Sequence, residues 1–137
     1  MAAPLDRVNP PDLAAPSGFS HAVVAAVSEG SRVVFLAGQT GMDAAGAIVA
    51  GGLVAQFERA LANLLAALAA AGGRPEQLAT LTVYIVDMED YRRRAGEIGA
   101  VWRRLAGRDY PAMAGIGVSR LWDAEALVEL QGAAVLP

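Results

Sequence analysis

The chain has 137 residues, 55% of them hydrophobic and only 6% aromatic, and its formal net charge at pH 7 is −3. This length fits a single folding domain, whose core must be built largely from Ala, Val and Leu. Cysteine is absent, which excludes disulfides, thiolate metal sites and cysteine nucleophiles. The small acidic excess argues against nucleic acid as a partner, because phosphate binding requires a basic patch.

Neither a leader peptide nor a membrane segment is predicted. Prolines and charged residues interrupt the N-terminal stretch, unlike the continuous apolar core of a signal peptide. The longest apolar run, Leu64 to Ala71, is far shorter than the roughly 20 residues that a membrane helix needs. We therefore expect a cytoplasmic protein without a membrane partner.

The first elements are predicted to be strands. Residues 1–16 are expected to form a flexible lead-in, because Pro10 and Pro11 lack amide hydrogens, and residues 17–137 to form one domain. Two segments rich in Val and Ala flank a turn at Gly30 and predict a β-hairpin, and a short third strand is predicted to follow. The three predicted strands are His21 to Val27, Arg32 to Gln39 and Ala47 to Ala50.

A helix and a strand are predicted next. Apolar residues recur every three or four positions from Leu53, which is typical of one face of an α-helix, and Gly72-Gly73 ends it. Thr80 to Val86 alternates apolar and polar residues, as a strand with two different faces does. The predicted apolar stripe of the helix consists of Leu53, Phe57, Leu61, Leu64 and Leu68.

A second helix and two last strands complete the chain. Asp87 is a candidate N-cap, and Gly107 is expected to end the helix. The order is then βββαβαββ, an α+β fold in which both helices cover one face of a single mixed sheet. The other face remains apolar, and association of several copies would bury it. The helix stripe is Tyr91, Ala95, Ile98, Trp102 and Leu105, and the strands are Ala112 to Leu121 and Ala126 to Val135.

Five motifs in this order resemble the RidA (YjgF) family over the region from Phe19 onward. The resemblance implies a chorismate-mutase-like fold and a homotrimer with three clefts for a small metabolite at subunit boundaries. Many members hydrolyse enamines or imines without a cofactor. The motifs are Phe19-Ser20-His21-Ala22-Val23, Val33 to Gln39, Thr82-Val83-Tyr84 with Asp87, Tyr110-Pro111-Ala112, and Leu127-Val128-Glu129-Leu130.

The chain departs from the family where the resemblance places the substrate. Family deaminases carry an arginine for the substrate carboxylate immediately after the Pro-Ala of the penultimate strand, where this chain has Met113. A thioether has no hydrogen-bond donor, whereas a guanidinium pairs with a carboxylate through two. Phe19, Ala95 and Gly115 replace a tyrosine, an asparagine and a cysteine of the family. We expect a less polar pocket in which Phe19 and Met113 contact the ligand.

Glu129 matches the strand glutamate of the family, which the resemblance makes the catalytic proton-transfer group. An ion pair with an arginine across the trimer interface is the alternative role for Glu129. Gln131 shares its strand face and is a candidate for binding substrate or water, or for a cross-strand hydrogen bond. The resemblance places the backbone of Gly38, followed by Gln39, beside the ligand. A β-bulge is the alternative reason for a glycine at position 38.

Three other groups of basic residues are candidates for the site: Arg120, His21 and the arginines at positions 92 to 94. Arg120 lies an odd number of positions after Met113, so it replaces the missing arginine only if a bulge restores the strand parity. His21 is the only histidine, so we expect a hydrogen-bonded structural role and no metal site. Arg92, Arg93 and Arg94 are expected on a solvated helix face.

The sequence thus predicts a cofactor-independent deaminase of a reactive enamine, imine or related metabolite, with altered substrate preference. Two alternatives stay open. One is a noncatalytic metabolite-binding or regulatory trimer, and the other is a biosynthetic isomerase or cyclase on the same scaffold.

Overall fold

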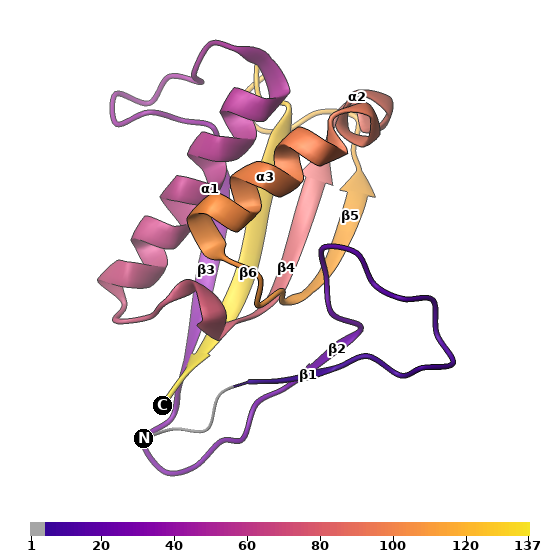
Figure 1. The fold of residues 1–137 in the computed structure, drawn as a ribbon. Coiled ribbons are helices and arrows are strands. Elements are labelled where there is room, and N and C mark those ends of the chain that lie inside the picture. Colours follow the sequence, from indigo (N-terminus) through magenta and orange to yellow (C-terminus); the bar gives the residue numbers. More distant parts are fainter. Residues whose placement is uncertain (1–4) are drawn as a thin grey trace.

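A computed structural model describes residues 5–137 (Figure 1). These residues form six strands, three α-helices and one 3-10 turn. Helices cover one side of the main sheet, which has four strands. The strands are β1 (Asp6–Val8), β2 (Ala22–Val24), β3 (Arg32–Thr40), β4 (Leu78–Ile85), β5 (Ala112–Gly117) and β6 (Val128–Leu136). The helices are α1 (Gly52–Ala70), α2 (Met88–Arg93) and α3 (Ala95–Ala106), and the 3-10 turn is η1 (Pro75–Gln77).

The main sheet has the strand order β3-β6-β4-β5. The C-terminal strand β6 lies between β3 and β4 and runs antiparallel to both, while β4 and β5 are parallel and joined through α2 and α3. Strands β1 and β2 form a separate two-stranded ribbon. The last strand therefore sits at the centre of the sheet, where both neighbours fix the direction of its side chains.

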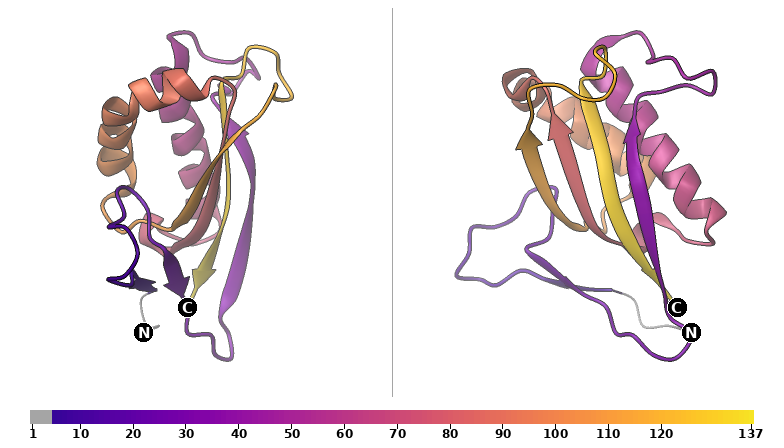
Figure 2. Two further views of the ribbon diagram at one scale, coloured as in Figure 1. Left: turned by 90° about the vertical axis from the view of Figure 1, so that its right-hand side faces the viewer. Right: turned by 180° about the vertical axis from the view of Figure 1, so that it is seen from behind.

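Helices α1 and α3 pack on one face of the sheet and build the core with it (Figures 1 and 2). Leucines of α1 pack with the inward side chains of β4 and β6 in one hydrophobic core, which also contains Trp102 of α3. By length and composition α1 is apolar enough to cross a membrane. Its apolar stripe, however, is buried against the sheet, as in the core helix of a globular fold.

The other face of the sheet is not covered by any element of residues 5–137 (Figure 2, left). Alternation along β3 turns Val33 and Phe35 to this outer face, where they are 51% and 85% exposed. Ile116 of β5 is 43% exposed and pairs with Tyr84 on the same face. Val33 and Phe35 lie on one edge strand of the sheet and Ile116 on the other, so Val33 and Phe35 together are the apolar pair on this face that an association surface would use.

The predicted α+β fold with helices on one face of a mixed sheet is confirmed. The first helix ends at Ala70, before Gly72, which adopts a positive φ of 89°. Strand β4 keeps the predicted alternation, and the Asp87 carboxylate caps α2 by accepting a hydrogen bond from the Asp90 amide. These elements are governed by local periodicity and capping, which a single sequence displays.

The predicted structure of the N-terminal third is wrong in two respects. The segment 1–16 contains β1, because the Arg7 guanidinium donates to the carbonyl oxygens of Glu76, Asp109 and Tyr110 and ties this segment to the domain. The predicted hairpin also does not form: β2 pairs with β1, whereas β3 pairs with β6. The turn at Gly30 is present, but the strands on either side of it pair with β1 and β6 instead of with each other.

Two further predictions need correction. Ala47 to Ala50 is not a strand; it makes one bridge, between Met42 and Ile48, because the Asp43 carboxylate accepts from the amides of Ala45 and Ala47 and turns the chain. The second helix is divided into α2 and α3 at Arg94. Gly96 follows this break, and glycine favours helix interruption because it has low helix propensity.

Candidate functional site

Glu129 lies on the outer face of the sheet, directly above Gly38. A β-carbon built at Gly38 would overlap the Glu129 carboxylate and lie 2.9 Å from its Cδ. The pairing of β3 with β6 shifts register between Leu36 and Gln39, so Gly38 belongs to a bulge. The predicted bulge is therefore present, and the structure adds a second reason for the glycine, because the Glu129 carboxylate occupies the space of a side chain. The predicted contact of the Gly38 backbone with a ligand stays a prediction.

The Glu129 carboxylate is half-buried and has polar neighbours on its own face. Tyr84 of β4 is its register partner, and the Tyr84 hydroxyl donates to Gln131 Oε1 at 3.1 Å. The ion pairs within residues 5–137 do not include Glu129. The predicted cross-strand hydrogen bond of Gln131 is thus present, and it leaves the Gln131 amide nitrogen open to donate to a ligand. Tyr84 enters the sequence prediction as part of a family motif without a role in the site, and the sheet register places it opposite Glu129.

Gln39 is one of the predicted binding residues that the structure does not bring to Glu129. Gln39 pairs with Leu130, which is fully buried on the helix side. Directly paired residues of antiparallel strands share a face, so Gln39 points away from Glu129. Thr40 is the residue of β3 that pairs with Glu129.

Two amide side chains of α1 hold this site from the helix side. Gln56, 5% exposed, donates to the Glu125 carbonyl and accepts from the Leu127 amide, at 3.1 and 2.8 Å. Asn63 donates to the carbonyls of Thr40 and Met42. These bonds fix the segment entering β6 and the end of β3, the two segments that place Glu129 and Gly38. Sequence analysis missed both residues, whose signal is a polar amide within the apolar helix.

Met113 lies on the opposite face of the sheet, in a pocket of about 440 Å³ between the sheet and α3. Its register partner is Leu81, which is buried against the helices. Burial raises the pKa of the Tyr91 hydroxyl to about 12, so this group stays a neutral donor at physiological pH. The wall of the pocket is mostly apolar, and its principal side chains are Phe57, Tyr91, Ile98, Trp102, Tyr110 and Met113.

Phe19 lies near this pocket without lining it. The buried Ser20 bonds to the backbone of Tyr110 and Pro111 and so joins the N-terminal segment to the start of β5. Ser17 and Gly18 reach the pocket, whereas the Phe19 ring packs edge-on against His21 with 5.1 Å between centroids. The predicted residues thus form two groups on opposite faces, Glu129 with Gly38 and Gln131, and Met113 with the pocket.

The remaining charged residues take structural roles. Arg120 donates to the carbonyls of Leu121 and Trp122 in the loop after β5, and it does not line the Met113 pocket. His21 Nε2 bonds to the Ala14 carbonyl at 2.8 Å. Arg93 and Arg94 pair with Asp90 on the exposed side of α2. Among residues 5–137 no three potential metal ligands come together.

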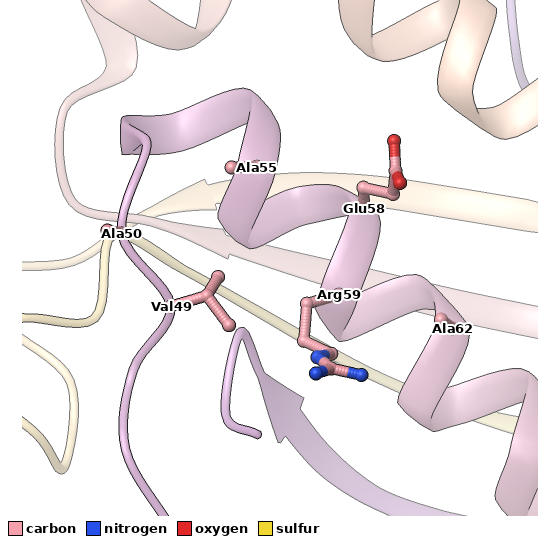
Figure 3. A pocket seen from close by; sticks show the side chains of 6 residues that line it. All are labelled: Val49, Ala50, Ala55, Glu58, Arg59 and Ala62. Carbon is pink, nitrogen blue, oxygen red and sulfur yellow. The ribbon is translucent and has the colours of Figure 1, made fainter.

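A second hollow, of about 350 Å³, lies along the N-terminal half of α1 (Figure 3). It is lined by Val49, Ala50, Ala55, Glu58, Arg59 and Ala62. Glu58 is bound by Arg104 of α3, and no predicted site residue lines this hollow.

Comparison with known proteins agrees with this geometry. A sequence model of the family described as "Endoribonuclease L-PSP" matches residues 11–136. The RutC family protein UK114 of Drosophila melanogaster is 32% identical over 82% of this chain and 75% of its own length. A 2-iminobutanoate/2-iminopropanoate deaminase of Mus musculus is 32% identical over 66% of this chain and 64% of its own length.

Solved structures show the same fold. The Rid-family protein YyfB of Yersinia pestis superimposes with a TM-score of 0.83 and 34% identity, covering 98% of this chain and all of that one. TdcF of E. coli, solved with bound serine, has a TM-score of 0.68 and 26% identity over 90% of this chain and 91% of its own. Family structures therefore bind small ligands. With a family match over almost the whole sequence and the same architecture, the chain belongs to the RidA (YjgF) family.

Proposed function

We propose that this protein is a homotrimeric deaminase that hydrolyses a reactive enamine, imine or related small metabolite in clefts between subunits. The observation that carries the proposal is the Glu129 carboxylate above Gly38 on the open sheet face, free of ion pairs within residues 5–137. Relatives named 2-iminobutanoate/2-iminopropanoate deaminase support this reaction class.

The chemistry needs one group that both accepts and donates a proton. An enamine first takes a proton on carbon and becomes an imine. Glu129 then takes a proton from water as its oxygen adds to the imine carbon, and passes this proton to nitrogen to give a carbinolamine. It next takes the hydroxyl proton of the carbinolamine as the carbonyl forms, and delivers it to nitrogen as the carbon–nitrogen bond breaks. The products are a carbonyl compound and ammonia. The Gln131 amide and the Gly38 backbone border the same space and would orient substrate and water.

The separation of the two residue groups supports association of several copies. Glu129 and the Met113 pocket occupy opposite faces of one sheet, so a cleft that contains both requires a second copy of the chain. The exposed Val33 and Phe35 of β3 would supply apolar side chains for that contact. One subunit would then contribute Glu129, and its neighbour the pocket.

We predict poor activity on 2-aminoacrylate, the small carboxylate-bearing substrate of family deaminases. Met113 has no donor, and each lost charge-assisted hydrogen bond costs about 1.5 to 3 kcal/mol. This corresponds to roughly ten- to a hundredfold weaker binding. A coupled assay that generates 2-aminoacrylate and follows its disappearance measures the difference from an arginine-containing homologue.

The same assay distinguishes the deaminase from its main rival. Replacement of the anchoring arginine by Met113 also favours a noncatalytic metabolite-binding trimer, which would retain the cleft without turnover. Imines made by oxidising a series of amino acids of increasing side-chain size test both. Accelerated release of ammonia from at least one imine supports the deaminase, whereas binding without acceleration across the series contradicts it.

Changing Gly38 to alanine is expected to lower turnover about ten- to a hundredfold, because the new β-carbon displaces the Glu129 carboxylate and a misplacement near 1 Å has such effects. Stability should change little, since the carboxylate is the movable end of a long side chain. Gly117→Ala is the matched control, because its nearest neighbour would be Met88 Cε at 3.8 Å. Equal turnover in both variants would show that the position of the carboxylate is not critical.

A further inference from the structure

The Met113 pocket contains a cation that the family comparison does not assign. Arg103 of α3 lines this pocket together with Gly99, and a β-carbon at Gly99 would lie 3.1 Å from Arg103 Nη1. The guanidinium therefore folds back along the helix, over the space that a larger side chain at position 99 would fill. Ala95 and Gly96, like Gly99, have small or no side chains and also line the pocket along α3.

Arg103 forms no ion pair and no side-chain hydrogen bond within residues 5–137. Ion pairs within residues 5–137 engage its neighbour Arg104 with Glu58, and Arg94 with Asp90 and Glu97, but they do not include Arg103. An arginine that lies along a pocket wall without a carboxylate presents its donors to an anion.

Trp102 also lines this pocket and has a buried donor without an acceptor among residues 5–137. Trp102 is only 4% exposed, and the donor is its indole Nε1. Buried donors without a partner are uncommon in native structures and call for a physical explanation. The neutral hydroxyl of Tyr91 stands in the same wall. The pocket thus combines aromatic side chains with donors and has no acidic side chain in its lining.

We propose that this pocket takes the planar, apolar body of a carboxylate substrate and that Arg103 binds its carboxylate in place of the family arginine that Met113 replaces. This inference rests on the proposed function, because it names the substrate class of the same cleft. The apolar body packs on Met113, Trp102 and Phe57. A volume of about 440 Å³ lies within the range of about 300 to 1,000 Å³ typical of small-molecule sites.

The proposal also accounts for the expected rejection of 2-aminoacrylate. That molecule has a carboxylate but no apolar body to fill the pocket, so it gains little of the burial that holds a larger substrate. An imine with an aromatic or branched apolar side chain satisfies both parts of the site.

The test measures binding of phenylacetate, a stable probe, by calorimetry on the full-length protein. Arg103→Gln is expected to weaken binding tenfold or more, and Arg103→Lys should restore part of the loss. Arg108→Gln is the matched control. Arg108, like Arg103, is an exposed arginine that precedes Tyr110 in the sequence, but it does not line the pocket. Phenylacetamide, which keeps the ring but lacks the charge, should bind weakly and equally to parent and Arg103→Gln protein.

Fluorescence provides a second readout at the pocket itself. Trp122→Phe removes the exposed tryptophan and leaves Trp102 as the sole reporter, whose emission should change with phenylacetate at the concentrations that calorimetry gives. Undetectable phenylacetate binding by the parent protein, equal affinity in Arg103→Gln and Arg108→Gln, or binding of phenylacetamide to the parent protein as tight as that of phenylacetate would overturn the proposal. Arg103-dependent binding of phenylacetate without imine hydrolysis would refute the deaminase but leave the anion site intact. Imine hydrolysis at the same rate in the parent and Arg103→Gln proteins would refute the anion site but leave the deaminase intact.

Discussion

Replacing Glu129 with glutamine is expected to slow imine hydrolysis by about a hundredfold or more, the usual contribution of a positioned general acid or base. Glutamine has nearly the same shape and keeps hydrogen bonds to its neighbours, but it cannot take a proton from water or return one to nitrogen. The loss should appear in kcat more than in KM, because binding contacts remain while the chemical step fails.

Glu125→Gln is the matched control for this variant. It makes the same change in charge four residues earlier, where only the backbone carbonyl of Glu125 contributes a bond, to Gln56. Light scattering and a thermal melt complete the comparison. A Glu129→Gln protein that dissociates while Glu125→Gln stays assembled would make Glu129 a member of an interface ion pair, and an assembled, fully active variant would remove it from the proton transfer.

The elements that were predicted well are those whose evidence is local. The repeat of leucines in α1 and the alternation in β4 reflect burial on one side, and each is visible within a short window. Strand partners leave no such local sign. Strand β3 joins β6 almost a hundred positions later, and β1 is fixed by Arg7 reaching carbonyls near residues 76 and 110. The predicted hairpin fails for this reason although its turn is present.

The candidate site shows the same division between local and distant information. Family resemblance located Glu129 and Gly38, and their contact depends on a bulge that no sequence period displays. Arg103 was missed because its helix was read only for the buried stripe. Its signal was the set of small residues at positions 95, 96 and 99, which recur on one side of α3 and leave the arginine uncovered.

Changing Phe35 to glutamate is expected to convert the trimer into monomers at micromolar concentration. Phe35 is 85% exposed on the outer face of the edge strand β3, so it contributes little to the fold of one chain and can contribute fully to a contact between copies. An unpaired carboxylate buried in such a contact costs several kcal/mol, and every 1.4 kcal/mol lowers the association constant about tenfold. Multi-angle light scattering gives the mass directly.

Leu13→Glu is the control for this last variant, since Leu13 is also an exposed large hydrophobic residue but lies in the N-terminal segment away from the sheet. It should remain trimeric. Circular dichroism should show the Phe35→Glu monomer still folded, because the core between the helices and the sheet is untouched. Deaminase activity should disappear with the trimer, since the proposed cleft takes Glu129 and the Met113 pocket from different copies. A monomer that retains full activity would place the whole site within one chain and contradict the shared cleft, and a Phe35→Glu trimer would move the interface off this face.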